Sequence, residues 1–473
     1  MVQKGREFSV AMTTSLAREL AAHLDKGSTQ EDLTFAAWRR SEGQTRTTAV
    51  LNRLLLPKDG DRVLQGNVAF TSDYLSRALN ELEQGEGLAL LHSHLGPGWQ
   101  GMSSDDIVAE RDRLAGACFG RTRLPIVGLT RGTDGAWSAR RWLRVDRNRY
   151  EREDATTVRV VGRRLTITFH PKMRPAAGEN RRQVATVSVW GDAAQAALAR
   201  VRVAIVGLGS VGSLVAEASA RMGVSKFVLV DHDKIEARNL DRTAGATQRD
   251  SDRGRSKVDV SARHIKAVAT STDLTVDPVR ASLLEPSGMK AALDADVIFS
   301  CVDRPWPRHA LNAIAYNNLI PVVDGGVLVK VDGDRLVHID WRIQTVGPER
   351  GCLVCIGALD PDEVSLDLAG KLDDPDYIAN LPAERRSVLS RRNVYPFSMA
   401  VAAHEVLQFV GLITGLERIG GLGPQHYHAY PGIMEVAEHV ECKSDCGYRA
   451  LTGGVSDLRG NLDPSSADGP VAL

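Results

Sequence analysis

The spacing of hydrophobic positions changes near residue 180 and divides the chain into two parts. In the first part the pattern predicts helices and short buried strands in mixed order. Helices are expected at 8–24, 71–83 and 107–117, and strands at 33–38, 47–55, 87–91 and 125–129. From about residue 180, strands and helices alternate, which is typical of a parallel sheet with crossover helices. The strands expected there are 201–206, 226–230, 296–301 and 321–324, with a helix at 211–222.

Length agrees with this division, because 473 residues at about 150 per domain correspond to two or three cores. We expect a first domain at 1–147 and a second at 176–450. The Arg-, Asp- and Glu-rich residues between them, 148–175, are expected to form a solvated linker. The last residues, 451–473, are rich in Gly, Ser, Asp and Pro and are expected to be disordered.

Charge and hydropathy narrow the choice of partners. Lys plus Arg number 59 and Asp plus Glu number 59, so there is no electrostatic case for nucleic acid or an anionic membrane as the main partner. The most apolar stretch, 394–416, is interrupted by His404, Glu405 and Gln408, and we expect a buried helix rather than a membrane span. Charged residues near the start interrupt any apolar run of a signal peptide, so we expect a cytoplasmic protein.

A glycine-rich motif follows the predicted strand 201–206. Gly207, Gly209 and Gly212 lie directly before the predicted helix, and Asp231 closes the next strand. Such glycines let the backbone turn tightly and approach phosphates, whose charge meets the free amides of the helix N-terminus. An acidic side chain about 20 residues on accepts hydrogen bonds from a ribose. By itself this motif predicts a nucleotide site, with an NAD-dependent dehydrogenase as the default.

Further motifs change that interpretation. The run Asp231-His-Asp233 is followed by Asn239-Leu-Asp-Arg242, by Lys257 and by Ser300-Cys-Val-Asp303. In this order, residues 176–450 resemble the ubiquitin-activating and ThiF-type adenylyltransferase family. The resemblance implies a Rossmann-like, mainly parallel-sheet domain that uses ATP and Mg²⁺. A dehydrogenase would leave the added cations and Asp303 unexplained.

Adenylation of a carboxylate needs positive charge around the triphosphate, and Arg242 and Lys257 would supply it. The resemblance implies that Asp231 holds the ribose, that Asn239 contacts the phosphates and that Asp303 binds Mg²⁺. Asp233 is expected near the metal or the loop. In Asn180-Arg-Arg-Gln183, Arg182 would reach across a homodimer to the partner's phosphates; alternatively, Arg181 and Arg182 are solvated charges at a helix start.

Four of the six cysteines form two close pairs, Cys352 with Cys355 and Cys442 with Cys446. Two such pairs are typical of a closed tetrahedral Zn²⁺ site with a structural role. The alternative is four reduced thiols without a metal.

No cysteine lies at 357–395, where family members that form a thioester with their substrate carry one. Ser387, or else Ser390, is the candidate to accept the acyl group as an oxyester. The alternative is that the chain only adenylates and that a thiol of another protein attacks the adenylate.

A second constellation lies in the first domain. His92 and His94 end a predicted strand, so both imidazoles point the same way, and Asp106 from the next helix would supply a third zinc ligand. With Ser103, these residues resemble the JAMM (JAB or MPN+) metalloprotease motif, and the resemblance implies a JAB/MPN-like α/β zinc peptidase domain. Eight residues separate His94 from Ser103, one more than usual, which leaves Asp105 as a competing ligand.

A zinc peptidase also needs a carboxylate that moves the proton from water to the leaving amine. Glu31 fits this role best, with Glu42 as the alternative. Ser103 would stabilise the oxyanion.

Together these motifs predict a two-headed enzyme of a bacterial ubiquitin-like pathway. One head would adenylate the C-terminal glycine of a ubiquitin-like protein for transfer to a conjugating-enzyme-like protein. The other would cleave precursors or conjugates after the same glycine. The alternative is sulfur-carrier activation with a carrier-processing peptidase.

Overall fold

The chain forms two compact units, which are described separately. The computed structural model describes residues 6–25, 30–65, 67–178, 180–332, 335–381, 393–416, 423–437 and 440–456. Within that range, the first unit comprises residues up to 175 together with 452–456, and the second comprises 176–451.

The first unit is built on a mixed sheet of nine strands, in the order β11-β10-β1-β3-β2-β6-β7-β8-β9. The pairs β1–β10, β1–β3 and β6–β7 are parallel and the others are antiparallel. The strands are β1 (Glu7–Thr13), β2 (Leu33–Glu42), β3 (Arg46–Leu55), β6 (Gly87–Ser93), β7 (Val127–Arg131), β8 (Trp137–Asp146), β9 (Arg149–Asp154), β10 (Thr157–Val161) and β11 (Leu165–Phe169). A separate hairpin pairs β4 (Arg62–Gln65) with β5 (Asn67–Phe70).

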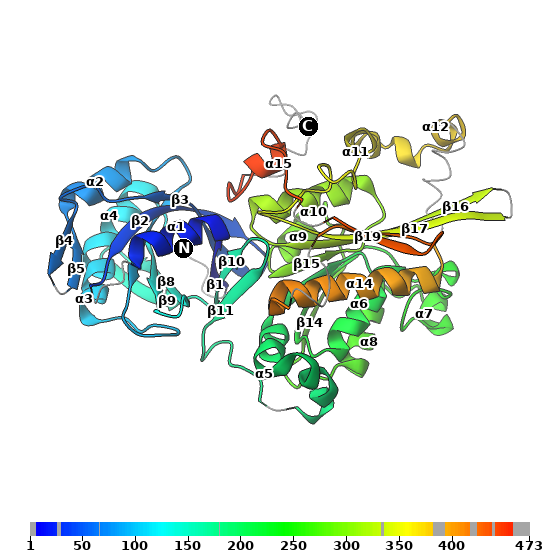
Figure 1. The fold of residues 1–473 in the computed structure, drawn as a ribbon, viewed down its shortest axis with the longest axis horizontal. Helices are drawn as coiled ribbons and strands as arrows, with labels where there is room; N and C mark the ends of the chain where they lie inside the picture. Colours follow the sequence, from blue (N-terminus) through cyan, green and yellow to red (C-terminus); the bar gives the residue numbers. More distant parts are fainter. Residues whose placement is uncertain are drawn as a thin grey trace. The chain divides into compact units, whose positions relative to one another are not determined.

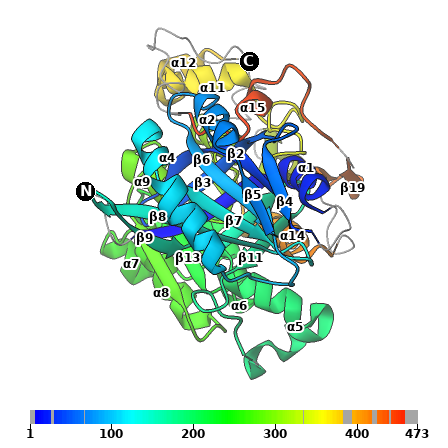
Figure 2. The same cartoon turned by 90° about the vertical axis from the view of Figure 1, so that its left-hand side faces the viewer.

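Helices cover both faces of this sheet (Figure 2). Leu16, Leu20 and Leu24 of α1 pack on one face, and Tyr74, Ala78 and Cys118 of α2 and α4 pack on the other. The helices are α1 (Thr14–Leu24), α2 (Ser72–Asn80), α3 (Ser104–Ile107), a π-helical turn (Val108–Leu114) and α4 (Ala115–Thr122). The unit therefore has a two-sided core, as an α/β domain requires.

Two predictions for this unit are wrong. Residues 8–24 were expected to be one helix, but β1 precedes α1 there. β1 lies between β10 and β3, and its apolar residues continue directly into those of α1, because Thr13 both ends the strand and caps the helix. Residues 148–175 were expected to be a linker, but they supply β9, β10 and β11. Some of their charges pair across strands, as between Arg141 and Glu153 (Nε–Oε2, 2.7 Å), whereas others, such as Arg149, remain exposed.

The second unit contains a mixed sheet of eight strands, in the order β14-β13-β12-β15-β16-β17-β18-β19. The first five strands are parallel and the last three are antiparallel, so the sheet is Rossmann-like and mixed rather than mainly parallel. The strands are β12 (Arg202–Val206), β13 (Lys226–Val230), β14 (Thr275–Val279), β15 (Val297–Ser300), β16 (Val322–Asp332), β17 (Arg335–Val346), β18 (Gln425–His428) and β19 (Ile433–Val436).

Helices pack on both faces of this sheet as well (Figure 1). The helices α6 (Ser210–Arg221), α8 (Lys257–Val268) and α14 (Tyr395–Thr414) cover one face, and α9 (Pro286–Ala292) and α10 (Pro305–Asn317) cover the other. The remaining helices are α5 (Val184–Arg200), α7 (Gln248–Asp252), α11 (Pro361–Leu368), α12 (Pro375–Ala379) and α15 (Gly447–Ala450).

The helix α14 is long and apolar enough to cross a membrane by length and composition, but more than half of it is buried inside the unit. Glu405 and Gln408 are fully buried. The Thr345 hydroxyl of β17 donates a hydrogen bond to the side-chain amide oxygen of Gln408 (2.7 Å). The prediction of a buried core helix at 394–416 is therefore confirmed.

Candidate functional site

The order of the strands places one candidate site at the carboxyl ends of β12 and β15. β13 and β14 lie on one side of β12, whereas β15 and β16 lie on the other. The order in which strands are added to the sheet therefore reverses between β12 and β15, although the two strands are parallel. Ligands of open α/β sheets bind at such a switch point. Val206 pairs with both Val230 and Ser300, so the loops that follow β12, β13 and β15 leave the sheet at the same edge.

The glycine loop fills the gap at this edge so tightly that side chains are excluded. Gly207 has a φ of +87°, and a Cβ there would lie 2.5 Å from the carbonyl oxygen of Cys301. A Cβ at Gly212 would overlap the carbonyl oxygen of Gly207. Gly209, which precedes α6, is different, because nothing lies within 4 Å of its Cβ position. Gly207 and Gly212 are thus required for packing, while Gly209 faces open space beside the first amides of α6.

Asp231, directly after β13, fixes the glycine loop by hydrogen bonds to the backbone. Its side chain is buried, and the two carboxylate oxygens accept hydrogen bonds from the backbone N–H groups of Leu208 (2.7 Å) and Asp233 (2.8 Å). The carboxylate therefore joins the ends of β12 and β13. One lone pair on each oxygen is used in this way, and the others can still accept bonds from hydroxyl groups.

Lys257 lies at the start of α8, and its ammonium contacts the Asp233 carboxylate (Nζ–Oδ2, 2.8 Å). Burial alone would raise the pKa of Asp233, but the hydrogen bond from Lys257 holds that pKa below its ordinary value. The Lys257 side chain is only 12% exposed, so its charge lies inside the edge and not in bulk solvent. This pair brings a cation to the loop that follows β13.

The other residues predicted to contact the nucleotide lie on turns and loops around the glycine loop or at the start of α5. Asn239 caps a short turn by accepting the N–H of Glu236 (3.0 Å), and Arg242 contacts Asp241 (2.8 Å). Asp303 is exposed on the loop after β15. Arg182 is exposed at the N-terminal side of α5, so within one chain its side chain faces solvent.

A buried charge network behind this edge was not predicted. Asp324 of β16 is fully buried and accepts hydrogen bonds from Arg308 (Nε, 3.0 Å), Ser300 (2.8 Å) and Gln344. Buried charges need such partners, because each would otherwise cost several kcal/mol. The network fixes β15, β16 and α10 relative to one another just behind the Asp303 loop.

Glu405 of α14 lies at the other side of this network. Burial and the charge of Asp324 raise the pKa of Glu405 well above its ordinary value, which favours the neutral form of this acid. Its carboxyl group contacts the Cys301 thiol (3.8 Å). The one sequence signal that could have found it is a Glu within an otherwise apolar helix.

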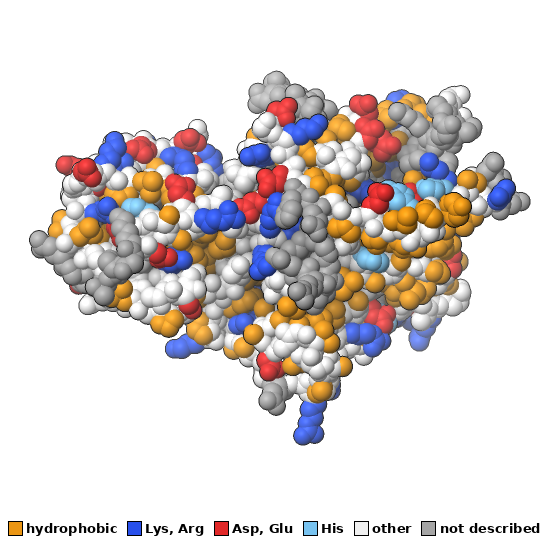
Figure 3. Space-filling model, in the orientation of Figure 1, with side chains coloured by type: hydrophobic (Ala, Val, Ile, Leu, Met, Phe, Trp, Pro, Cys, Tyr) orange, Lys and Arg blue, Asp and Glu red, His pale blue; other side chains and the backbone are white. Residues whose placement is uncertain are grey.

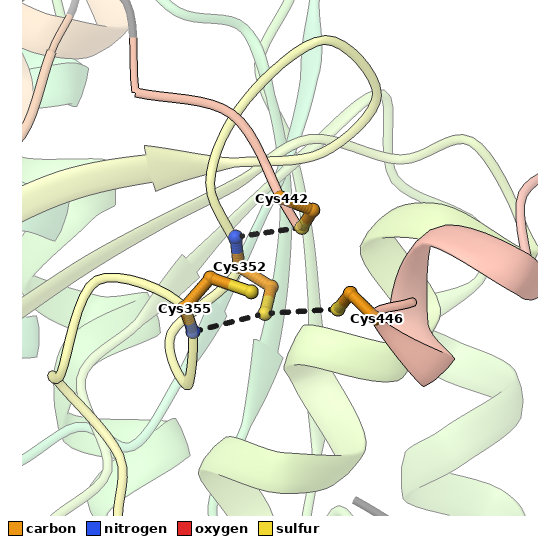
Figure 4. A group of neighbouring side chains, drawn as sticks. All are labelled: Cys352, Cys355, Cys442 and Cys446. Carbon is orange, nitrogen blue, oxygen red and sulfur yellow. Dashed lines mark hydrogen bonds between the residues drawn. The ribbon is translucent and has the colours of Figure 1, made fainter. Parts of the chain in front are cut away.

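The four paired cysteines converge in the second unit (Figure 4). Their sulfur atoms all lie within 4.8 Å of one another, with Cys352 and Cys446 3.7 Å apart. The N–H of Cys352 donates to the Cys442 sulfur (3.2 Å), and that of Cys355 donates to the Cys352 sulfur (3.3 Å). Four thiolates at these distances suit Zn²⁺, and such a closed site is structural. This arrangement is consistent with the predicted zinc site.

A second metal-ligand cluster lies in the first unit, at the end of β6. His92, His94 and Asp106 each offer a ligand atom, all within 4.8 Å of one another. The two Nε2 atoms are 3.1 Å apart, and each lies 3.3–3.4 Å from an oxygen of Asp106. Asp106 is therefore the carboxylate that meets the histidines, while Asp105 is exposed on the same turn. Two imidazoles and one carboxylate with an open side form a donor set that fits catalytic zinc.

Charge at this cluster is strongly coupled. The hydrogen bond to Asp106 raises the pKa of His94, and the negative charge of Glu31 adds to the shift. Glu31 lies two residues before Leu33, the first residue of β2, which pairs with His92. Glu42 ends the same strand nine residues beyond Leu33, about 30 Å away at the usual rise per residue. Only Glu31 of the two lies at the histidine end.

Ser103 caps α3 and binds Asp106 in both directions. Its hydroxyl accepts the N–H of Asp106 (3.1 Å), and its own N–H donates to the Asp106 carboxylate (2.7 Å). This capping box fixes Asp106 toward the histidines. The hydroxyl hydrogen of Ser103 is not used in these two bonds.

A second buried network, also not predicted, supports His92. Thr130 of β7 lies 3.4 Å from the His92 Nε2, and Arg140 of β8 donates to the Thr130 hydroxyl. Arg140 in turn pairs with the fully buried Glu110, which also accepts the indole N–H of Trp142 (2.8 Å). These hydrogen bonds fix the position of Thr130 next to His92.

Ser387 and Ser390, the predicted acyl acceptors, lie outside the described residues.

The match to a known protein family lies in the second unit. The sequence model of the ThiF family matches residues 180–425, which is 246 of the 473 residues. The ubiquitin-like modifier-activating enzyme 5 of Drosophila virilis is 30% identical over 164 residues, which cover 32% of this chain and 38% of that protein. The SAMP-activating enzyme E1 of Haloferax volcanii is 28% identical over 166 residues, which cover 35% of this chain and 57% of that protein.

The chain thus spans about two fifths to three fifths of the length of these relatives. Among solved structures, a crystal structure of E. coli MccB with ATP is 16% identical, with a TM-score of 0.44; the match covers 57% of this chain and 74% of that one.

Proposed function

Because the chain belongs to the ThiF family, we propose that its second unit uses ATP to adenylate the C-terminal glycine of a ubiquitin-like protein. The observation that carries this proposal is the edge where the glycine loop, Asp231 and Lys257 meet. The printed names of two relatives, a ubiquitin-like modifier-activating enzyme and a SAMP-activating enzyme, support a small protein as substrate.

In the proposed reaction the glycine carboxylate attacks the α-phosphorus of ATP. The bond from the α-phosphorus to the bridging oxygen breaks, so that an acyl-adenylate and pyrophosphate form. Asp231 accepts the ribose hydroxyls, while the amides at Gly209 and the start of α6 meet the phosphates. Lys257 and Arg242 neutralise the charge that develops, and Asn239 adds a polar contact.

Asp303 would hold Mg²⁺, which supplies further positive charge to the phosphates, and Asp233 keeps Lys257 in place. Arg182 would reach the phosphates of a second copy in a homodimer. The role of Asp303 depends on a bound ion, and that of Arg182 depends on a second copy of the chain. Variants of these two residues should therefore be compared both in adenylation activity and in oligomeric state.

Pyrophosphate exchange into ATP, stimulated by a ubiquitin-like protein ending in glycine, tests this proposal. Lys257→Met should lower the exchange rate by about 10²–10³, the usual effect of removing one charge-stabilising donor. Lys234→Met is the matched control, because Lys234 is exposed on the loop after β13, next to Asp233, and has no role in the proposal. Equal rates in the two variants would contradict it.

A second activity is favoured by the convergence of His92, His94 and Asp106. We propose that the first unit is a zinc isopeptidase that cleaves after the glycine of the same ubiquitin-like protein. Zinc held by these residues would act as a Lewis acid toward the scissile amide. Glu31 would carry the proton to the leaving amine, and the Ser103 hydroxyl would donate to the oxyanion.

Cleavage of a fusion that follows the C-terminal glycine tests this second activity. Glu31→Gln should abolish cleavage and leave the zinc content unchanged, because Glu31 is not a ligand. Glu42→Gln should cleave as the wild type does, because Glu42 lies at the other end of β2. Cleavage that survives Glu31→Gln would exclude this proton carrier.

We also propose that Ser387 accepts the acyl group as an oxyester before transfer to a conjugating-enzyme-like protein. Intact mass after incubation with Mg-ATP would then show an adduct of the small protein, absent in Ser387→Ala and present in Ser390→Ala. Adenylate without any adduct would favour direct attack by another protein's thiol, or sulfur-carrier activation.

A further inference from the structure

Three histidines surround one carboxylate at the antiparallel end of the second sheet. His338 Nε2 lies 2.6 Å and His426 Nε2 lies 3.5 Å from Oδ2 of Asp340. His428 Nδ1 lies 3.3 Å from Oδ1 of the same residue, and its Nε2 lies 3.6 Å from Glu435. None of these residues belongs to the nucleotide edge or to either metal cluster described above.

Strand register brings the group together. Asp340 of β17 is directly opposite His428 of β18, and His426 is two residues before His428 on the same face. His338 is likewise two residues before Asp340. Because both strands are regular here, the side chains are fixed by the sheet and not by a loop.

The burial of the group suits ion binding from solvent. Asp340 is 9% exposed, whereas the imidazoles of His426 and His428 are 45% and 27% exposed. Figure 3 shows histidine side chains gathered on the surface over this part of the second unit. The carboxylate thus forms the floor and the rings form the open rim.

The ligand atoms of Asp340, His426 and His428 all lie within 4.8 Å of one another. The rings of the two histidines are 4.2 Å apart and tilted by 45°. Two imidazole nitrogens and one carboxylate oxygen are a donor set for divalent first-row transition metals such as Zn²⁺. Arg342 is paired with His426 across the strands, but its guanidinium donates a hydrogen bond to the carbonyl of Ala358 (2.7 Å).

We propose that Asp340, His426 and His428 bind a divalent transition-metal ion of the Zn²⁺ type. His338 orients the Asp340 carboxylate through its 2.6 Å hydrogen bond, as partners of metal-bound carboxylates commonly do. The ion cross-links β17 to β18 and so holds the last hairpin of the sheet. The site is separate from the adenylation and peptidase proposals and does not depend on either.

Zinc stoichiometry of the full-length chain tests this site. The chain is equilibrated with micromolar Zn²⁺, passed through a desalting column, and analysed by mass spectrometry of the metal. The double variant His426→Gln, His428→Gln should hold one Zn²⁺ fewer per chain than the wild type. The control His404→Gln, on α14, should hold the wild-type amount. An unchanged zinc count in the double variant would overturn the proposal.

A second measurement uses a variant of nearly identical shape, in case the double variant does not fold. Asp340→Asn removes the negative charge but keeps the volume of the side chain. Added Zn²⁺ should raise the melting temperature of the wild type more than that of Asp340→Asn. Equal shifts in the two proteins would mean that the ion binds elsewhere, and would refute the site.

Discussion

The open space beside Gly209 leads to a prediction about ATP binding. Gly207 and Gly212 have neighbours that exclude a Cβ, but a Cβ at Gly209 would meet nothing within 4 Å. If the phosphates occupy this space, Gly209→Ala should leave the fold intact and weaken ATP binding. Gly212→Ala is the comparison, because its Cβ would overlap the backbone of the loop itself.

The magnitudes follow from these environments. Gly209 caps α6, and alanine is a poorer cap than glycine by less than about 1 kcal/mol. At Gly212, overpacking costs about 1–3 kcal/mol, of which up to about 1 is offset by the better helix propensity of alanine. ATP at 100 times its Kd should stabilise the wild type by about 2.7 kcal/mol. Loss of one charged hydrogen bond to phosphate, worth about 1.5–3 kcal/mol, would reduce that gain to half or less.

Thermal unfolding with and without Mg-ATP measures both effects. Without ATP, Gly212→Ala should melt a few degrees below the wild type, and Gly209→Ala should melt close to it. With ATP, Gly209→Ala should show half the wild-type shift or less. A full ATP shift in Gly209→Ala would refute the assignment of this space to the phosphates.

Three further predictions concern stability. Arg308→Leu leaves the buried Asp324 without its main partner, so urea titration should show that the free energy of unfolding falls by about 3–5 kcal/mol. A decrease below about 1 kcal/mol would mean that the other donors to Asp324 suffice. Burial lowers the pKa of His309 to about 4. The unfolded chain therefore binds this proton first as the pH falls, and stability should decrease by about 3 kcal/mol between about pH 6.5 and 4. His309→Gln should flatten that slope, and an unchanged slope would contradict the assignment. Cys442→Ser should lower the zinc content by one ion and the melting temperature together; full zinc retention would show that the thiols bind no metal.

The parallel half of the second sheet was predictable because its signals are local. Residues 201–206 and 226–230 form short buried runs beside a glycine loop, and β12 and β13 lie there. β17 was not predicted, although it alternates Val337, Ile339 and Trp341 with polar residues, so its sequence does carry a strand signal. β18 and β19 have only four residues each, too few to show a period clearly. β1 was mistaken for a helix because no turn residues separate it from α1, and Thr13 both ends the strand and caps the helix.

The sequence indicated the cysteine cluster, the His92 cluster and the glycine loop, because each contains ligands that are close together in the chain, such as Cys352 with Cys355. Asp324, Glu405 and Glu110 were not found, because their partners are 16 to 104 residues away in the chain. A buried acid is recognised only when the fold has brought an arginine or another acid to it. Spacing therefore predicted the ligands of these sites, whereas the supporting networks required the structure.

The mass of the small protein after incubation with the enzyme is the most direct test of adenylation by the second unit. A ubiquitin-like protein ending in glycine is mixed with Mg-ATP and the Glu31→Gln, Ser387→Ala variant, in which cleavage and acyl transfer are both blocked. The small protein should gain one AMP on its terminal carboxylate, and Lys257→Met in the same background should prevent this gain. ATP binding without any AMP on the small protein would exclude adenylation by the second unit.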